Sequence, residues 1–152
     1  MPTLLLQSCR SSGFESAFAA VRRVELEPAP LGEGGFGVVH RAVSVDGVRP
    51  RVPQVVKILK DFGPGTAKRG LETVRALQTK MEAADRELRK TSPRGLLETH
   101  PFFVGAPQFS FEGTLDGRPA RGYSANDLVA LGYEDFSAVL GDGARLRRFL
   151  AT

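Results

Sequence analysis

The chain has 152 residues, of which 41% are hydrophobic and 25% charged, values that are ordinary for a globular chain able to bury one core. The net charge of +4 is modest and the basic residues are dispersed, which argues against a nucleic-acid-binding surface. The single cysteine, Cys9, excludes an internal disulfide and favours a cytoplasmic protein, and neither a metal site nor a membrane span is expected.

The first 31 residues predict one short helix and one edge strand. Residues 1–13 carry no clear pattern. From Phe14 to Val24, apolar residues recur at helical spacing, which predicts a short amphipathic helix. The following stretch to Leu31 contains Pro28 and Pro30, and this composition favours an edge strand of a sheet.

A glycine-rich stretch comes next, with Gly32, Gly34 and Gly37 at G-x-G-x-x-G spacing. A dinucleotide-binding fingerprint would open a helix. Here the glycines precede a β-branched run, residues 38–45, that ends at Asp46-Gly47, a strong hairpin signal. A second apolar run, residues 55–59, has a lysine at its centre. We therefore expect two strands of a β-hairpin.

The charge of Lys57 requires a reason, because its neighbours in the strand are apolar. Glycines let backbone N–H groups approach phosphate oxygens and permit unusual φ angles at a hairpin tip. The lysine would add a compact positive charge for the same phosphates. This hypothesis competes with a simpler one, in which a glycine-rich turn lies near a surface lysine.

The second half of the chain predicts one long helix and another hairpin. The helix extends from residue 70 or 71 to 89 or 90. The turn Leu115-Asp116-Gly117-Arg118 joins two strands, residues 109–112 and 120–126. The apolar residues of the helix recur at spacings of three and four, and we expect them to pack on the sheet: Leu71, Val74, Leu77, Met81, Ala84 and Leu88.

The order of these elements resembles the protein kinase family, whose signature is a G-x-G-x-x-G-x-V loop followed by a V-A-I-K strand. The glycines and Val39 match the loop, Phe36 matches the aromatic residue at its tip, and Val55-Val56-Lys57 is similar to V-A-I-K. The resemblance implies an α+β fold like the kinase small lobe, an antiparallel sheet of about five strands with one long helix packed on it. It divides the chain into an N-terminal extension with a short helix (1–23), a small lobe (24–128) and a post-hinge segment (129–152).

The resemblance also implies an ATP site. In the family, a helix glutamate pairs with the lysine that contacts the phosphates. Family spacing favours Glu72 as the partner of Lys57, while Glu82 and the absence of such a pair stay open. The hinge residue that borders the adenine is expected at Ser124 or Ala125. The implied ATP-binding residues are Leu31, Gly32, Gly34, Gly35, Phe36, Gly37, Val39, Val55, Lys57, Ser124 and Asn126.

The sequence contains no H-R-D or D-F-G tripeptide, the motifs that supply the catalytic aspartate and a Mg²⁺ ligand in kinases. Three hypotheses stay open. The chain is the small lobe of a kinase that transfers phosphate from ATP to a serine or threonine of a protein substrate, with Mg²⁺, once a large lobe is attached. Alternatively, it is a noncatalytic module that binds a nucleotide or a partner, or an α+β scaffold that binds no nucleotide.

Overall fold

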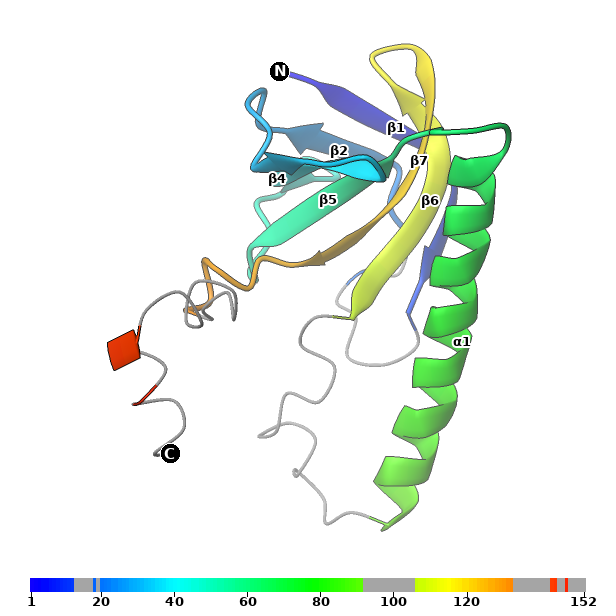
Figure 1. The fold of residues 1–152 in the computed structure, drawn as a ribbon, viewed down its shortest axis with the longest axis vertical. Helices are drawn as coiled ribbons and strands as arrows, with labels where there is room; N and C mark the ends of the chain where they lie inside the picture. Colours follow the sequence, from blue (N-terminus) through cyan, green and yellow to red (C-terminus); the bar gives the residue numbers. More distant parts are fainter. Residues whose placement is uncertain (13–17, 19, 92–105, 133–142, 145–146, 148–152) are drawn as a thin grey trace.

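The computed structural model of the chain describes residues 1–12, 18, 20–91, 106–132, 143–144 and 147. All strand pairings are antiparallel, in the order β2-β1-β6-β7-β5-β4-β3. A further pairing of β2 with β4 closes six strands into a barrel, with β3 outside the closed ring (Figure 1). The elements in chain order are β1 (Thr3–Ser11), β2 (Arg23–Leu26), β3 (Gly32–Glu33), β4 (Gly37–Val45), β5 (Gln54–Leu59), α1 (Thr66–Thr91), β6 (Pro107–Leu115) and β7 (Arg118–Asn126).

The closed barrel corrects our expectation for the fold class. An α+β fold with an open sheet of about five strands and a packed long helix, as in the kinase small lobe, was wrong. The difference comes from the first 26 residues, which supply β1 and β2. β1 joins β2 to β6, and β2 joins β1 to β4, so the sheet has no open edge at this place.

The pattern of β1 explains why the sequence did not predict this strand. A bulge between Leu6 and Ser8 shifts its register against β6. Leu4 and Leu6 therefore pack toward the core with Cys9, at a spacing of two and then three, while Leu5 is exposed. The strict alternation that marks a strand is lost. The helix expected from Phe14 to Val24 was wrong over its second half, because residues 20–22 are not helical and Arg23 and Val24 belong to β2. Its residues 14–17 and 19 lie outside the described residues.

The division of the chain into residues 1–23, 24–128 and 129–152 stays a prediction, and most of the last segment lies outside the described residues.

Both hairpin turns expected from the sequence are confirmed. Asp46 and Gly47 have φ values of 51° and 80°, and Asp116 and Gly117 have φ values of 49° and 84°. Two consecutive residues with positive φ form the turn that best fits the twist of a two-stranded hairpin. The first turn follows β4, and the second joins β6 directly to β7.

The aspartates of these two turns also hold the N-terminal strands. Asp46 Oδ1 accepts hydrogen bonds from the backbone N–H groups of Arg22 and Arg23, each 2.9 Å long. Asp116 Oδ1 accepts a hydrogen bond of 3.0 Å from the N–H of Thr3. Each turn therefore fixes the start of one of the strands that close the barrel.

The core fills the interior of the barrel. Phe109 and Phe111 on β6 are fully buried, with ring centroids 6.4 Å apart. Gly122 on β7 makes room for Phe111, because a β carbon there would lie 3.0 Å from Cζ of Phe111 and would clash with the carbonyl oxygen of Lys57. The other buried core residues are Leu4, Val21, Val24, Leu26, Val45, Val56 and Ala120.

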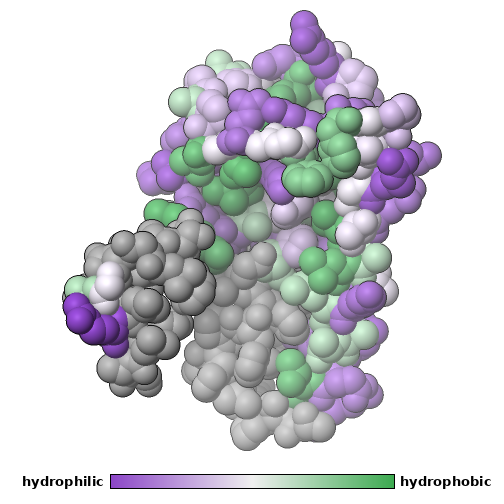
Figure 2. All heavy atoms as spheres, viewed as in Figure 1, coloured by the Kyte–Doolittle hydropathy of each residue, from purple (hydrophilic) through white to green (hydrophobic). Residues whose placement is uncertain are grey.

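The long helix α1 begins at Thr66, earlier than predicted, because Asp61 Oδ1 accepts a hydrogen bond of 2.9 Å from the N–H of Ala67 and caps it. The helix contacts β5, β6 and β7. Its apolar stripe packs only in part: Leu71 is buried, but 42% of Leu77 is exposed. Figure 2 accordingly shows hydrophobic residues beside hydrophilic ones on the surface of this helix.

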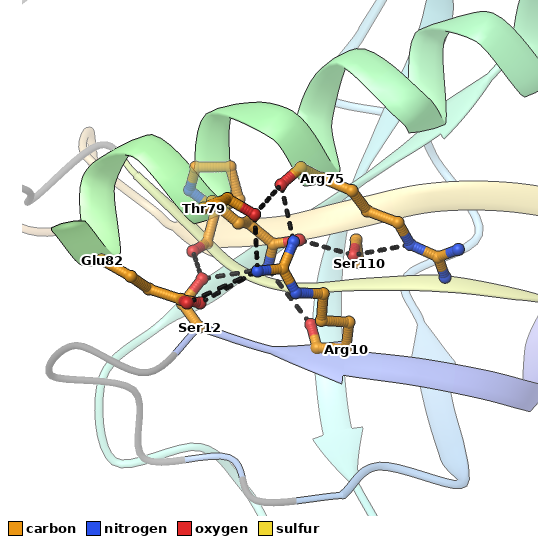
Figure 3. A network of polar contacts seen from close by, with 8 residues as sticks. Arg10, Ser12, Arg75, Thr79, Glu82 and Ser110 are labelled. Carbon is orange, nitrogen blue, oxygen red and sulfur yellow. Dashed lines mark hydrogen bonds and ion pairs between the residues drawn. The ribbon is translucent and has the colours of Figure 1, made fainter.

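Polar side chains replace part of the expected apolar contact (Figure 3). Gln78 on α1 is fully buried. Its Nε2 donates to the carbonyl oxygen of Arg10 (3.1 Å) and to Oγ of Ser12 (3.0 Å), and its Oε1 accepts a 2.7 Å hydrogen bond from Oγ of Ser110. This one side chain thus connects α1 to β6 and to the end of β1.

Arg10 adds a second set of polar contacts between β1 and the helix. Its guanidinium donates to the carbonyl oxygen of Arg75 (2.6 Å) and to Oγ1 of Thr79 (2.9 Å). It also forms an ion pair with Glu82 at 3.4 Å. The position of α1 against the barrel therefore depends strongly on directional hydrogen bonds.

Candidate functional site

The glycine-rich stretch forms a hairpin at the edge of the barrel. Gly32 on β3 pairs with Val39 on β4, and the N–H of Leu31 donates to the carbonyl oxygen of Val39 at 2.7 Å. The N–H of Gly34 donates to the carbonyl oxygen of Gly37 at 2.9 Å and closes the tip. All residues from Leu31 to Phe36 are exposed. This glycine hairpin of β3 and β4 is accessible from solvent, and it differs from the hairpin expected from residues 38–45 and 55–59, which β4 and β5 form.

The glycines at the tip have no structural requirement of their own. None of Gly32, Gly34 and Gly35 has a positive φ, so the unusual φ angles that we expected there are not observed. A β carbon at any of these three positions would have no neighbour within 4 Å. Backbone strain and packing therefore do not explain why the tip is so rich in glycine.

Gly37 differs from the other glycines of the hairpin. A β carbon at Gly37 would lie 2.6 Å from the carbonyl oxygen of Ile58, and 3.1 and 3.3 Å from Cε and Cγ of Lys57. In the sheet register, Lys57 is opposite Val39. The aliphatic chain of the lysine therefore lies beside Gly37, at the base of the hairpin tip.

Among the described residues, the ammonium group of Lys57 forms no hydrogen bond and no ion pair. Glu72 is exposed on α1 and does not pair with it, and Glu82 pairs with Arg10 instead. Neither candidate glutamate thus forms the pair that the sequence suggested.

The strand register places the expected hinge residues on opposite faces of the barrel wall. Ala125 pairs with Val55, and both lie on the outer face of the barrel together with Lys57. Ser124 is fully buried on the inner face, and its Oγ has no hydrogen-bond partner among the described residues. Asn126 also faces inward, at the barrel end. Of the expected hinge side chains, only Ala125 shares the face of the lysine.

Tyr123, which was not expected from the sequence, lies on the outer face of β7 and pairs directly with Lys57 on β5. Burial raises the pKa of its phenol above the ordinary value, so the side chain stays neutral in neutral solution. The sequence could have indicated this position, because side chains alternate between the two faces of a strand. Along residues 120–126 this alternation places Tyr123 and Ala125 on one face and Ser124 on the other.

A group of contacts, here called the hairpin clip, holds the tip against the segment after β5. The N–H of Lys60 donates to the carbonyl oxygen of Phe36 at 2.9 Å, and the ammonium group of Lys60 forms an ion pair with Glu33. The rings of Phe36 and Phe62 meet edge to face, with centroids 5.0 Å apart. The hydrogen bond from Lys60, and then its charge, lower the pKa of the Glu33 carboxyl below its ordinary value.

The described part of the chain contains no group of three or more histidine, cysteine, aspartate or glutamate residues placed to hold a metal ion. None of the helices within it is long and apolar enough to cross a membrane.

These features define a six-stranded antiparallel barrel with an accessible glycine hairpin and an adjoining lysine on its outer face. No family model matches the chain, and no curated protein or solved structure matches it either.

Proposed function

We propose that the glycine hairpin and Lys57 bind the phosphates of ATP. The observation that carries the proposal is the position of Lys57, whose side chain lies beside Gly37 while its charge is unpaired among the described residues. A cation with no internal partner, next to backbone that no side chain covers, is suited to an anion. Such binding would also explain why the tip is rich in glycine, because a ligand needs close access to the backbone N–H groups.

The base of the nucleotide would lie on the outer face of the sheet. Val39 pairs with Lys57 on this face, and Val55 pairs with Ala125 in the adjacent row of residues. Val39, Val55 and Ala125 are small or β-branched, half-buried and apolar, and such side chains suit the flat face of a purine.

Phosphoryl transfer to a serine or threonine of a protein is proposed only together with groups that the described residues do not supply. The reaction requires a carboxylate to accept the hydroxyl proton and ligands for Mg²⁺. For this chain by itself we propose nucleotide binding without catalysis. We place it in the cytoplasm, since its one cysteine requires no oxidising compartment.

The test compares ATP with adenosine by isothermal titration calorimetry, using the wild type, Lys57→Met and the control Lys68→Met. Lys68 is exposed on α1 and its replacement removes the same charge. We expect Lys57→Met to weaken ATP binding about tenfold and to leave adenosine binding unchanged. Lys68→Met should match the wild type. Equal ATP affinity in wild type and Lys57→Met would refute the phosphate role of Lys57.

A second function, the binding of a protein partner without nucleotide, is favoured by the exposed aromatic pair of the hairpin clip. The exposed fractions of Phe36 and Phe62 are 66% and 63%. Exposed aromatic side chains are frequent anchors in protein interfaces. If the wild-type chain binds neither ATP nor adenosine, this second function becomes the better one.

A further inference from the structure

A pocket of about 520 Å³ opens at the end of the barrel where β4 and β7 finish and β5 and β6 begin. Val45, the last residue of β4, contributes to it, whereas the glycine hairpin lies at the first residue of the same strand, Gly37. The pocket is therefore separate from the proposed nucleotide site. Its volume lies in the range of pockets that bind small molecules.

The walls of the pocket are mainly apolar. At its inner side, Nε2 of Gln54 donates to Oδ1 of Asn126 at 2.8 Å, so these two amides satisfy each other in part. An apolar cavity of this size is suited to an apolar molecule that displaces weakly held water. The larger apolar side chains that line it are Phe18, Val21, Val45, Val48, Pro50 and Val52.

The charges at the entrance are positive. Arg49 and Arg51 line the pocket from the exposed connection between β4 and β5. Neither arginine forms a hydrogen bond or an ion pair within the described part of the chain. Asp46 is the single carboxylate among the lining residues, and its Oδ1 already accepts the N–H groups of Arg22 and Arg23.

We propose that this pocket binds an amphipathic carboxylate, a small molecule with an apolar body and one anionic end. The apolar walls would hold the body. The guanidinium groups of Arg49 and Arg51 would bind the carboxylate, for which their planar donors have the matching geometry. A free phosphate or a nucleotide fits less well. Neither has an apolar body to cover the apolar walls, and the burial of its charge against those walls would cost free energy.

The experiment titrates the full 152-residue chain with octanoate and with octanol, which has the same number of carbon atoms and no charge. Amide chemical shifts locate the bound molecule, and calorimetry gives the affinity. We expect octanoate to bind at residues 45–54, about tenfold more tightly than octanol. Octanoate that fails to bind at millimolar concentration, or that binds elsewhere, would overturn the proposal.

The arginines are tested with the double variant Arg49→Met/Arg51→Met. Its control is Lys68→Met/Arg118→Met, which removes two exposed charges away from the pocket. The first variant should lower octanoate affinity to that of octanol, and the control should leave both affinities unchanged. Equal octanoate binding in the two double variants would exclude a role for Arg49 and Arg51.

A third variant separates pocket binding from a general surface effect. Ala20 lines the pocket and is exposed, so Ala20→Trp can fill the opening without a change in the core. We expect it to weaken octanoate and octanol alike, while ATP binding stays that of the wild type. Unchanged binding of both probes would place them outside the pocket. The outcome is independent of whether the hairpin binds ATP.

Discussion

The side chain of Lys57 on β5 lies against the position that a β carbon of Gly37 on β4 would occupy. Cε and Cγ of the lysine lie 3.1 and 3.3 Å from the position that a β carbon of Gly37 would occupy. The glycine thus has two roles at this place: it lets β4 approach the carbonyl oxygen of Ile58, and it leaves space for the lysine side chain. The remaining glycines of the hairpin have neither role.

We therefore expect Gly37→Ala to lower the free energy of unfolding by about 1–3 kcal/mol, because the added methyl group forces β4 away from β5. Urea denaturation measures the change. Gly34→Ala is the control: nothing lies within 4 Å of a β carbon there, so its stability should stay within about 0.5 kcal/mol of the wild type. A Gly37→Ala variant as stable as the control would contradict the close contact.

The ion pair of the hairpin clip predicts a pH dependence. The pKa of Glu33 is lower in the folded chain than in the unfolded chain, so the pair contributes above the ordinary carboxyl pKa and is lost as the pH falls through the folded value. NMR titration of the Glu33 carboxyl should show the lowered pKa, and Lys60→Met should return it to the ordinary range. Lys68→Met should leave it unchanged. The pair is exposed, so high salt should reduce the shift.

At the turn aspartates, we expect substitution by alanine to lower stability more than substitution by asparagine. Asp46 and Asp116 have positive φ, which alanine adopts only with strain, and each accepts backbone hydrogen bonds from the N-terminal strands. Asp116→Ala should lower the free energy of unfolding by about 1–3 kcal/mol. Asp116→Asn keeps an acceptor and tolerates the same φ, and should cost much less. If both variants were equally stable, the turn would not hold β1.

The buried hydrogen bonds of Gln78 predict that this residue contributes more to stability than Leu77, which the apolar pattern of the sequence had placed at the contact with the sheet. Gln78 is fully buried and 42% of its neighbour Leu77 is exposed. Gln78→Leu removes three hydrogen bonds and leaves buried polar groups behind, so we expect a loss of about 1–3 kcal/mol in denaturation experiments. Leu77→Gln should change stability by less than about 0.5 kcal/mol. The reverse order of the two effects would support the predicted apolar stripe.

Sequence patterns were most informative about elements whose cause is local. The two Asp-Gly turns, the strand after the glycines and the long helix were all expected, because turn residues and apolar periodicity act over a few positions. The start of the helix was predicted too late, because its cap, Asp61, lies before the periodic stretch. The burial of Gln78 was not expected at all, because its partners Arg10 and Ser110 are distant in sequence.

The features of the candidate site also divide into those encoded locally and those set by tertiary contacts. The sequence by itself determined that a glycine hairpin adjoins a strand with Lys57 at its centre, since these residues are close in the chain and the turn between them is encoded locally. Only the tertiary structure decided that Tyr123 and Ala125, not Ser124, share the face of the lysine, and that Glu72 and Glu82 do not pair with it. Only the tertiary structure closed the barrel, because the pairing of Leu4 with Leu115 joins segments from distant parts of the chain, and no local pattern encodes that choice.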